Sequence, residues 1–532
     1  MMAVKPARAN VRKSAKKPPQ MRFKTFPAPN AGLVLSGNLT EPAPRSAVVL
    51  NNGFPTLRGV RVRGGSTKHA TIGSFPVESM FTYEIGSTSK FFATGNGSIF
   101  EITAPADPDV APSAAVTGQS EDYYSTTSFS TAAGDYLYLV NGSDSPLLYD
   151  GSTFTAITGV SSPAITGVTT SLLSQVFSYK NRLFFVEGGT FKIWYLAADS
   201  ISGAATSFSL AGVFKKGGSL LFGATWSQDA GDGLDDKLVL VTTKGEVAIY
   251  EGSNPASDFS LVGRYEISPP LGKNAFTSAG GDLVIMTQSG MVPISEAVRR
   301  ELSVLNLAAI SRNIEPLWKE NVSLRTLPWE IIELPVLNMG VVSLPHTGSG
   351  SDQALVVNLQ TSAWGVYTGW DTRCIAKFGE NGYFGTNDGT VKLMESGGDD
   401  DGQPYVFQCS LTPDDLGAPG LQKTVKMGRS TFLAYQSLNP EVSASVNYDT
   451  VWPAAPQAGA DAGEDSVWDS AVWDSALWDG GLAKASRTKW ESIGVTGFAV
   501  SPQVQSTIAN DLEVQAEFVS FDVSYVIGGL HV

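Results

Sequence analysis

A short strand, a glycine-containing turn and a second short strand recur through the middle of the chain, and this repeat constrains the fold more than any other feature. The units run at 91–102, 136–151, 182–196, 237–252, 282–295 and 382–398, with a weaker one at 355–370. Most intervals are roughly 45 to 55 residues, about the size of one four-stranded propeller blade. Apolar and polar residues alternate inside each unit, as in half-buried strands. The repeat predicts a mainly β protein with a β-propeller of about six or seven blades. The turn glycines are Gly97, Gly142, Gly189, Gly245, Gly290 and Gly389.

The composition agrees with an all-β chain. Charged residues make up 17% of the 532 residues and glycine numbers 55, which favours strands joined by many tight turns over helices. No apolar run reaches the roughly 18 residues of a spanning helix, so no membrane segment is expected. The two cysteines, Cys374 and Cys409, are predicted to be buried free thiols, with a single disulfide as the alternative.

Changes in composition and in hydrophobic pattern along the chain predict four regions. Residues 1–30 are basic and rich in Pro and Ala, which predicts a disordered or docking arm. Residues 31–75 read as a β entry segment that belongs to a platform domain, and 76–402 hold the propeller. Within the propeller, 295–350 has apolar residues at helical spacing and predicts a helical insertion between blades. Strand-like runs in 403–532 predict a β-sandwich-like platform.

The charge is unevenly distributed. The net charge is −14, yet the first 40 residues contain eight Lys and Arg and no acidic residue. Lys13, Lys16 and Lys17 are therefore candidates for a docking contact with a neighbouring subunit; a solvated tail and direct contact with nucleic acid are the alternatives. The rest of the chain is strongly acidic, so it is not expected to hold DNA tightly, although DNA could slide past it.

Tryptophans mark two further candidate interfaces. Trp468, Trp473 and Trp478 recur every five residues, each followed by Asp, and this spacing fits neither a helix nor a strand. They either pack on their own domain or anchor a partner. Trp318 lies in the predicted helical insertion, which also breaks the β period. We expect both segments to face a partner.

Two other polar patterns have competing interpretations. Arg61 and Arg63 precede Gly64 and could lie on one strand face as a phosphate site, but surface or interface arginines are favoured. The acidic loops at 229–237 and 397–403 could hold calcium, but neither ends in the glutamate of an EF-hand, so solvated turns are favoured.

Catalysis has little support in the sequence. The three histidines are far apart, and no phosphate-binding loop is present. We therefore expect no catalytic, cofactor-binding or metal-binding residues, no cofactor and no enzymatic activity. Two other classes stay open: a propeller hydrolase of surface polysaccharide, and a propeller adhesin that binds glycan or protein. The hydrolase would place carboxylates, Arg and aromatic residues in one propeller mouth.

Several segments resemble the tail nozzle proteins of short-tailed bacteriophages, the group of tail tubular protein B and the packaged-DNA stabilisation proteins. They are NNGFPTLRGVRVRGG, VFSYKNRLFFVEGGTFKIWYL, KLVLVTTKGEVAIYEGSNP, SPPLGKNAF, DLVIMTQSGMVPISEAV and LQKTVKMGRSTF. The resemblance spans about residues 50–530 as patterning and implies a virion protein that forms a ring, hexameric in that family. Such a ring continues and closes the DNA channel below portal and adaptor, carries fibres or spikes, and passes DNA without sequence-specific binding. It implies assembly in the host cytoplasm and no catalytic residues.

Overall fold

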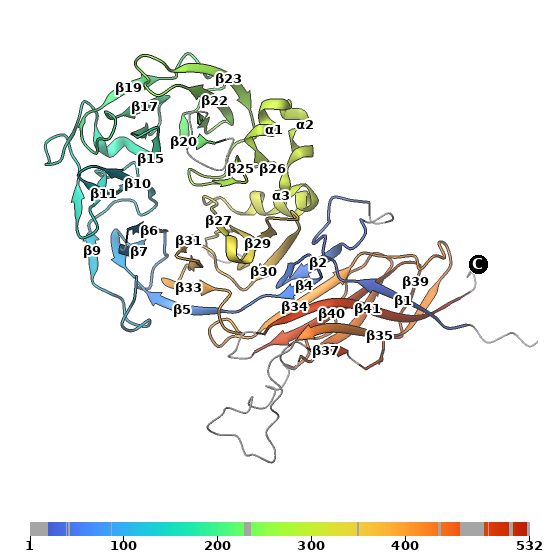
Figure 1. Cartoon of the computed structure of the whole chain (residues 1–532). Helices are drawn as coiled ribbons and strands as arrows, with labels where there is room; N and C mark the ends of the chain where they lie inside the picture. Colours follow the sequence, from blue (N-terminus) through green and yellow to red (C-terminus); the bar gives the residue numbers. More distant parts are fainter. Residues whose placement is uncertain are drawn as a thin grey trace, which may run out of the picture.

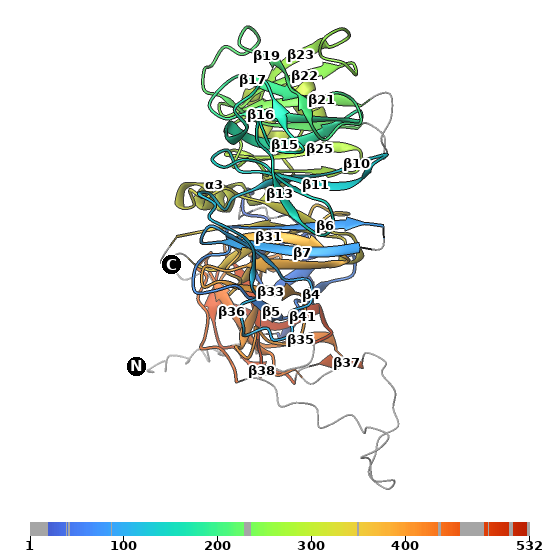
Figure 2. The same ribbon diagram turned by 90° about the vertical axis from the view of Figure 1, so that its left-hand side faces the viewer.

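The protein consists of a ring of β-sheets beside a second, layered β body (Figure 1). The computed structural model describes residues 20–38, 40, 43–86, 88–227, 236–347, 351–434, 438–457, 484–487, 489–509 and 514–528. The ring is the predicted propeller and the layered body is the predicted platform. The view turned by 90° shows the propeller standing on the platform (Figure 2).

Six sheets of three or four strands belong to the propeller alone in the described part of the chain. The first strands of several neighbouring sheets contact one another, so these sheets begin with their inner strand. The first three sheets are β6 (Ser79–Ile85), β7 (Thr88–Gly95), β8 (Ser98–Glu101) and β9 (Ala114–Thr117); β10 (Ser125–Thr131), β11 (Gly134–Val140), β12 (Leu147–Tyr149) and β13 (Phe154–Ala156); and β15 (Leu173–Tyr179), β16 (Arg182–Glu187), β17 (Lys192–Tyr195) and β19 (Thr206–Ser209).

The other three sheets complete this set. They are β20 (Leu220–Trp226), β21 (Lys237–Thr242), β22 (Glu246–Glu251) and β23 (Ser260–Glu266); β24 (Phe276–Ala279), β25 (Asp282–Thr287) and β26 (Gly290–Pro293); and β31 (Cys374–Phe378), β32 (Asn381–Gly385), β33 (Thr390–Met394) and β5 (Ser66–Thr71). A short parallel pair, β14 (Ile165–Thr166) and β18 (Gly203–Ala204), lies outside the blades.

The remaining place in the ring is filled by a sheet that the propeller shares with the platform. Strands β27 (Ile331–Leu334), β28 (Met339–Ser343), β29 (Gln353–Asn358) and β30 (Trp364–Thr368) form its propeller half. Strand β30 then pairs with β2 (Ala47–Asn51), and the sheet continues into the platform. The prediction of a mainly β chain with a propeller of six or seven blades is confirmed.

An early strand closes the ring. Strand β5 pairs antiparallel with β33, so residues 66–71 complete a sheet whose other strands lie more than 300 positions later. Ala70 and its partner Val391 are both fully buried in this closure. The predicted platform segment 31–75 therefore extends too far, because β5 belongs to the propeller.

The turn glycines that mark the sequence repeat all have positive φ angles and lie where the second strand of a sheet turns into the third; Gly290 is itself the first residue of β26. At Gly245, with φ of +77°, an added Cβ would lie 2.2 Å from the Ile267 carbonyl oxygen. Neither the backbone conformation nor the space tolerates a side chain there. The repeat is visible in the sequence because each such turn requires glycine.

A helical segment covers the three-stranded sheet. It contains α1 (Ile294–Arg299), α2 (Leu302–Leu305), α3 (Glu315–Leu324) and 3-10 turns at Asn306–Ala308 and Ile310–Ile314. The Ser311 hydroxyl accepts a hydrogen bond of 2.9 Å from the Met291 amide of β26, so it caps a strand edge that lacks a fourth strand. The predicted insertion at 295–350 is too long, because β27 and β28 begin the shared sheet.

The platform is a β-sandwich. One layer contains β3 (Gly53–Pro55), β4 (Val60–Val62), β41 (Ala516–Ile527), β35 (Lys423–Ala434), β37 (Lys484–Arg487), β38 (Glu491–Ser492), β39 (Thr496–Gly497) and β1 (Arg22–Pro27). The other contains β2, β34 (Tyr405–Leu411), β40 (Val500–Ile508) and β36 (Glu441–Val446). Phe407, Phe432 and Phe518 pack between the layers.

Three further expectations from the sequence can be compared with the structure. Strand β1 pairs along its length with β41, so residues 22–27 of the predicted arm are part of the platform. Cys374 and Cys409 are buried free thiols, as predicted. No helix in the described part of the chain is long and apolar enough to cross a bilayer.

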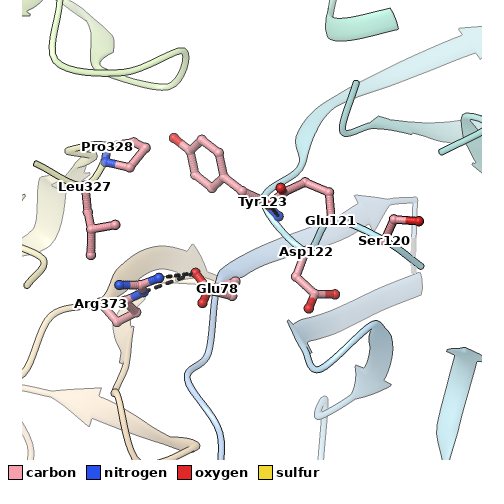
Figure 3. A pocket seen from close by; sticks show the side chains of 8 residues that line it. All are labelled: Glu78, Ser120, Glu121, Asp122, Tyr123, Leu327, Pro328 and Arg373. Carbon is pink, nitrogen blue, oxygen red and sulfur yellow. Dashed lines mark hydrogen bonds and ion pairs between the residues drawn. The ribbon is translucent and has the colours of Figure 1, made fainter. Parts of the chain in front are cut away.

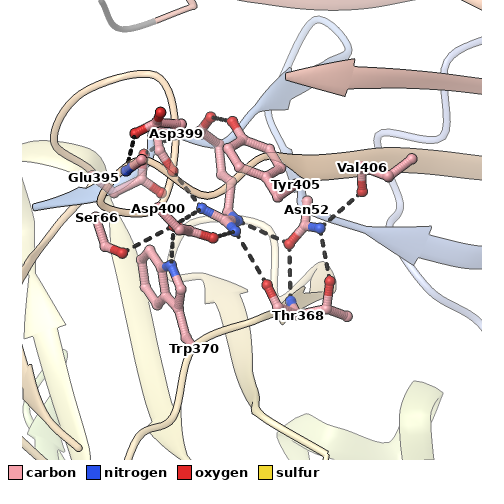
Figure 4. A network of polar contacts seen from close by, with 12 residues as sticks. Asn52, Ser66, Thr368, Trp370, Glu395, Asp399, Asp400, Tyr405 and Val406 are labelled. Carbon is pink, nitrogen blue, oxygen red and sulfur yellow. Dashed lines mark hydrogen bonds and ion pairs between the residues drawn. The ribbon is translucent and has the colours of Figure 1, made fainter. Parts of the chain in front are cut away.

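A buried arginine joins the two bodies where the chain passes between them. Arg63 lies between β4 and β5, and its side chain is fully buried. Its five N–H groups bond Asn52, the carbonyls of Gly64 and Thr368, and both carboxylate oxygens of Asp400 (Figure 4). The Tyr405 ring lies 3.7 Å from the guanidinium carbon. Arg63 is therefore not the surface arginine that the sequence favours. In the acidic loop at 397–403, residues 401–403 are exposed as expected of a solvated turn, but Asp400 is buried as the partner of Arg63.

Candidate functional site

A cavity of about 340 Å³ opens at the end of the ring where the inner strands begin. Its walls come from the segments that precede four inner strands: Glu78 before β6, residues 120–123 before β10, Leu327 and Pro328 before β27, and Arg373 before β31. Figure 3 shows Tyr123 and Arg373 reaching toward this space from opposite sides. We call this cavity the propeller mouth.

Charged groups line the propeller mouth. Arg373 binds Glu78 through Nε at 3.1 Å and through NH2 at 2.5 Å. Asp122 accepts a hydrogen bond of 2.8 Å from the Gly97 amide, while its other oxygen is buried with no hydrogen-bond partner among the described residues. Burial raises the pKa of Asp122 above its usual value. With Glu121 also present, the lining contains three carboxylates and one guanidinium, which suits a cationic or hydroxyl-rich ligand.

Beneath the propeller mouth lie a buried lysine and a buried glutamate. Lys273, just before β24, donates to the carbonyls of Tyr123 at 2.8 Å and Ser174 at 3.2 Å. Burial lowers the pKa of Lys273 to about 8. Glu330 accepts a hydrogen bond of 3.0 Å from the Ile375 amide, and burial raises its pKa to about 7. Both pKa shifts favour the neutral form of the group, because the interior disfavours charge.

Sequence reasoning did not find these residues. Each of them lies one to five positions before an inner strand, where the chain passes from one blade to the next. Such connections carry no fixed spacing, and no local motif distinguishes Glu78 or Arg373 from other surface charges. The one usable signal is position, since polar residues just before the first strand of each repeat unit converge at one end of a propeller.

The structure places Trp318 in the interior. Its side chain is 0% exposed, its indole N–H donates to the Thr287 carbonyl at 2.9 Å, and its ring lies 5.1 Å from that of Trp329. The prediction that Trp318 contacts a partner is therefore wrong. The helical spacing indicates the helix, but it does not tell which face of the helix is buried against the sheets.

The other predicted interface residues lie outside the described part of the chain. They are Lys13, Lys16, Lys17, Trp468, Trp473 and Trp478. Their proposed contacts stay predictions. The acidic loop at 229–237 also lies almost entirely outside the described residues.

Comparisons with known proteins give no family. No family model matches the chain, and no curated protein matches it. Among solved structures, the chain is similar to BBS1N in complex with ARL6DN (10% identity, TM-score 0.37, 63% of this chain and 97% of that chain). It is also similar to YCF48 from Cyanidioschyzon merolae (11%, 0.36, 62% and 98%) and to Sqt1 from Saccharomyces cerevisiae (11%, 0.38, 62% and 98%). The description of the fold therefore rests on the strand pairing given above.

Proposed function

We propose that the chain is a structural protein of a short-tailed phage virion, a subunit of the ring-shaped tail nozzle. The observation that carries this proposal is the buried, sheet-continuous joint between propeller and platform. One continuous sheet runs through both bodies. The buried ion pair of Arg63 and Asp400 links the segment by which the chain enters the propeller to the segment by which it leaves. A subunit that holds a channel and an attached appendage in register needs two bodies that do not move relative to each other.

Two further features support the proposal. The segments that resemble nozzle proteins fall in both bodies. NNGFPTLRGVRVRGG contains β3 and β4 of the platform, LQKTVKMGRSTF forms most of β35, and VFSYKNRLFFVEGGTFKIWYL contains β16 and β17 of the propeller. The acidic balance of the chain suits a channel wall that repels DNA phosphates and so does not retain them during passage. The partners would be further copies of the chain (six in a hexameric ring), an adaptor ring, fibres or spikes, and passing DNA. The chain would be assembled in the host cytoplasm.

The test is the assembly state of the purified full chain, alone and with the portal and adaptor proteins of its own phage. The expected result is a closed ring with a central hole that admits duplex DNA, seen in electron-microscope class averages and matched by the mass in solution. A chain that stays monomeric both alone and on the adaptor would contradict the proposal.

The propeller mouth favours a second candidate function, a propeller that binds or cleaves glycans. Glu78, Asp122, Tyr123 and Arg373 provide the carboxylates, arginine and aromatic ring that this function requires in one mouth. Surface polysaccharide of the host would be incubated with the full chain and with the E78Q and R373Q variants. Binding or release of reducing ends that both variants abolish would support this function, and the same readout cannot arise from ring assembly alone.

A further inference from the structure

Three potential metal ligands meet on the same end of the propeller as the mouth. The His346 Nε2 atom lies 2.8 Å from an oxygen of Asp352 and 3.8 Å from an oxygen of Asp371. All three atoms lie within 4.8 Å of one another, and the group is unique among the described residues in bringing at least three such ligands together. His346 follows β28, Asp352 precedes β29, and Asp371 lies between β30 and β31.

We propose that His346, Asp352 and Asp371 form a binding site for a divalent transition-metal ion of the zinc type. Ligand atoms that share a tetrahedral zinc ion lie roughly 3.3 Å apart, because each is about 2.0 Å from the metal. The distances of 2.8 Å and 3.8 Å from Nε2 of His346 lie on either side of that spacing. One imidazole with two carboxylates suits zinc better than calcium or magnesium, which prefer oxygen ligands alone.

The ligands are held in place before any ion arrives. Both oxygens of Asp371 are bound by Asn387, one by its backbone amide at 2.6 Å and one by its side-chain amide at 2.7 Å. Asn387 lies in the turn between β32 and β33, so a third loop orients this ligand. Hydrogen bonds of this kind fix the direction of a ligating carboxylate and are worth about 10- to 100-fold in metal affinity.

An arginine holds both ends of the loop that carries the other two ligands. Arg325 donates from NH1 to the Leu344 carbonyl and from NH2 to the Ser351 carbonyl at 2.8 Å. These two hydrogen bonds hold the ends of the connection between β28 and β29 close to each other, and so keep His346 near Asp352. Arg325 also offsets part of the negative charge of Asp352 and Asp371, so a bound ion supplies the remaining compensation.

The His346 side chain is largely buried, and its Nε2 atom is directed at the two carboxylates. Its side chain is only 10% exposed, and its Nδ1 atom is buried with no hydrogen-bond partner among the described residues. Asp352 is 47% exposed and leaves a route by which an ion can enter.

The site lies beside the propeller mouth and goes beyond the proposed structural role. Asp371 is two residues from Arg373, which lines the mouth. Three protein ligands leave a coordination position open, as in zinc sites that also bind a water or a small ligand. A bound ion would add positive charge to the wall of a cavity that is otherwise rich in carboxylates.

The test is a calorimetric titration of the full chain with zinc chloride, after treatment with a chelator. The sequence has three histidines, so the variants H69Q, H346Q and H531Q form a matched set. We expect one zinc per chain in the wild type, H69Q and H531Q, and at least tenfold weaker binding in H346Q and D371N. N387A should weaken binding about 10- to 100-fold without removing a ligand.

Several results would overturn the proposal. These are an absence of binding heat in the wild type, equal affinity in H346Q, or equal binding of calcium and zinc, which would indicate carboxylates alone. If H346Q and D371N fail to fold by circular dichroism, N387A and the visible spectrum of the cobalt-loaded wild type decide. Intense bands report a site of four or five ligands, and weak octahedral bands would count against it.

Discussion

Arg63 and Asp400 form a two-pronged ion pair across the joint between propeller and platform, with nitrogen–oxygen distances of 2.9 Å and 2.5 Å. Arg63 lies where the chain first enters the propeller, and Asp400 lies where it leaves for β34. The indole of Trp370 and the hydroxyl of Ser66 also donate to Asp400, at 3.2 Å and 2.9 Å. The ion pair therefore links the segment that enters the propeller to the segment that leaves it.

Replacing Asp400 by Asn should lower the free energy of unfolding by about 3 to 5 kcal/mol, because it leaves a buried guanidinium without its counter-charge. Denaturant unfolding of the full chain measures this loss. The matched control is K24M, which removes the more exposed pair of Lys24 and Asp414 and should cost no more than about 1 kcal/mol. Equal losses in the two variants would show that the buried pair has no special part in the joint.

Gly65 allows the segment entering the propeller to lie against the segment around Asp399 that leaves it. An added Cβ would lie 1.8 Å from the Asp399 carbonyl oxygen, and this oxygen accepts the Ser66 amide at 3.0 Å. G65A should therefore lower the free energy of unfolding by more than about 1 kcal/mol, which appears as a lower melting temperature. G212A is the control, since nothing lies within 4 Å of the Cβ it adds and its φ is not positive. A normal melting temperature for G65A would contradict the close contact.

Trp318 should be a stability residue and not an interface residue. W318A removes a fully buried indole that packs on Trp329 and Trp364, and it should cost about 3 to 5 kcal/mol. L324A on the same helix is the control, because Leu324 is 72% exposed and its loss should be within about 0.5 kcal/mol. Denaturant unfolding again provides the measurement. A W318A variant that is fully stable but fails to assemble would show that Trp318 acts at an interface with a partner.

The sequence predicted what depends on local pattern and missed what depends on distant partners. The blades were recognisable because Gly245 and its equivalents must be glycine and because strands alternate in polarity. The pairing of Arg63 with Asp400 joins residues 337 positions apart, and no spacing rule reaches that far. The same holds for Ala70, whose strand closes the ring, and for His346, which meets Asp371 only because successive blade connections lie at one end of the propeller.

Glu330 should make the stability of the protein depend on pH. Burial raises its pKa from an ordinary 4.5 to about 7 in the folded chain. Below about pH 4.5 the carboxyl is neutral in both the folded and the unfolded chain, and burial carries no charge penalty. As the pH rises toward 7 the unfolded chain ionises first, so stability is lost across this window.

The loss should reach about 3 kcal/mol at most, since one pKa unit corresponds to about 1.4 kcal/mol. The glutamine variant E330Q keeps an oxygen for the Ile375 amide and cannot ionise. The difference in unfolding free energy between E330Q and wild type should therefore grow in favour of E330Q between pH 5 and 7.5. Lys273 does not obscure this window, because its pKa of about 8 places its own effect between pH 8 and its ordinary 10.5. Parallel pH profiles for the two proteins would show that Glu330 is already ionised at pH 5 and that a nearby positive charge outweighs its burial.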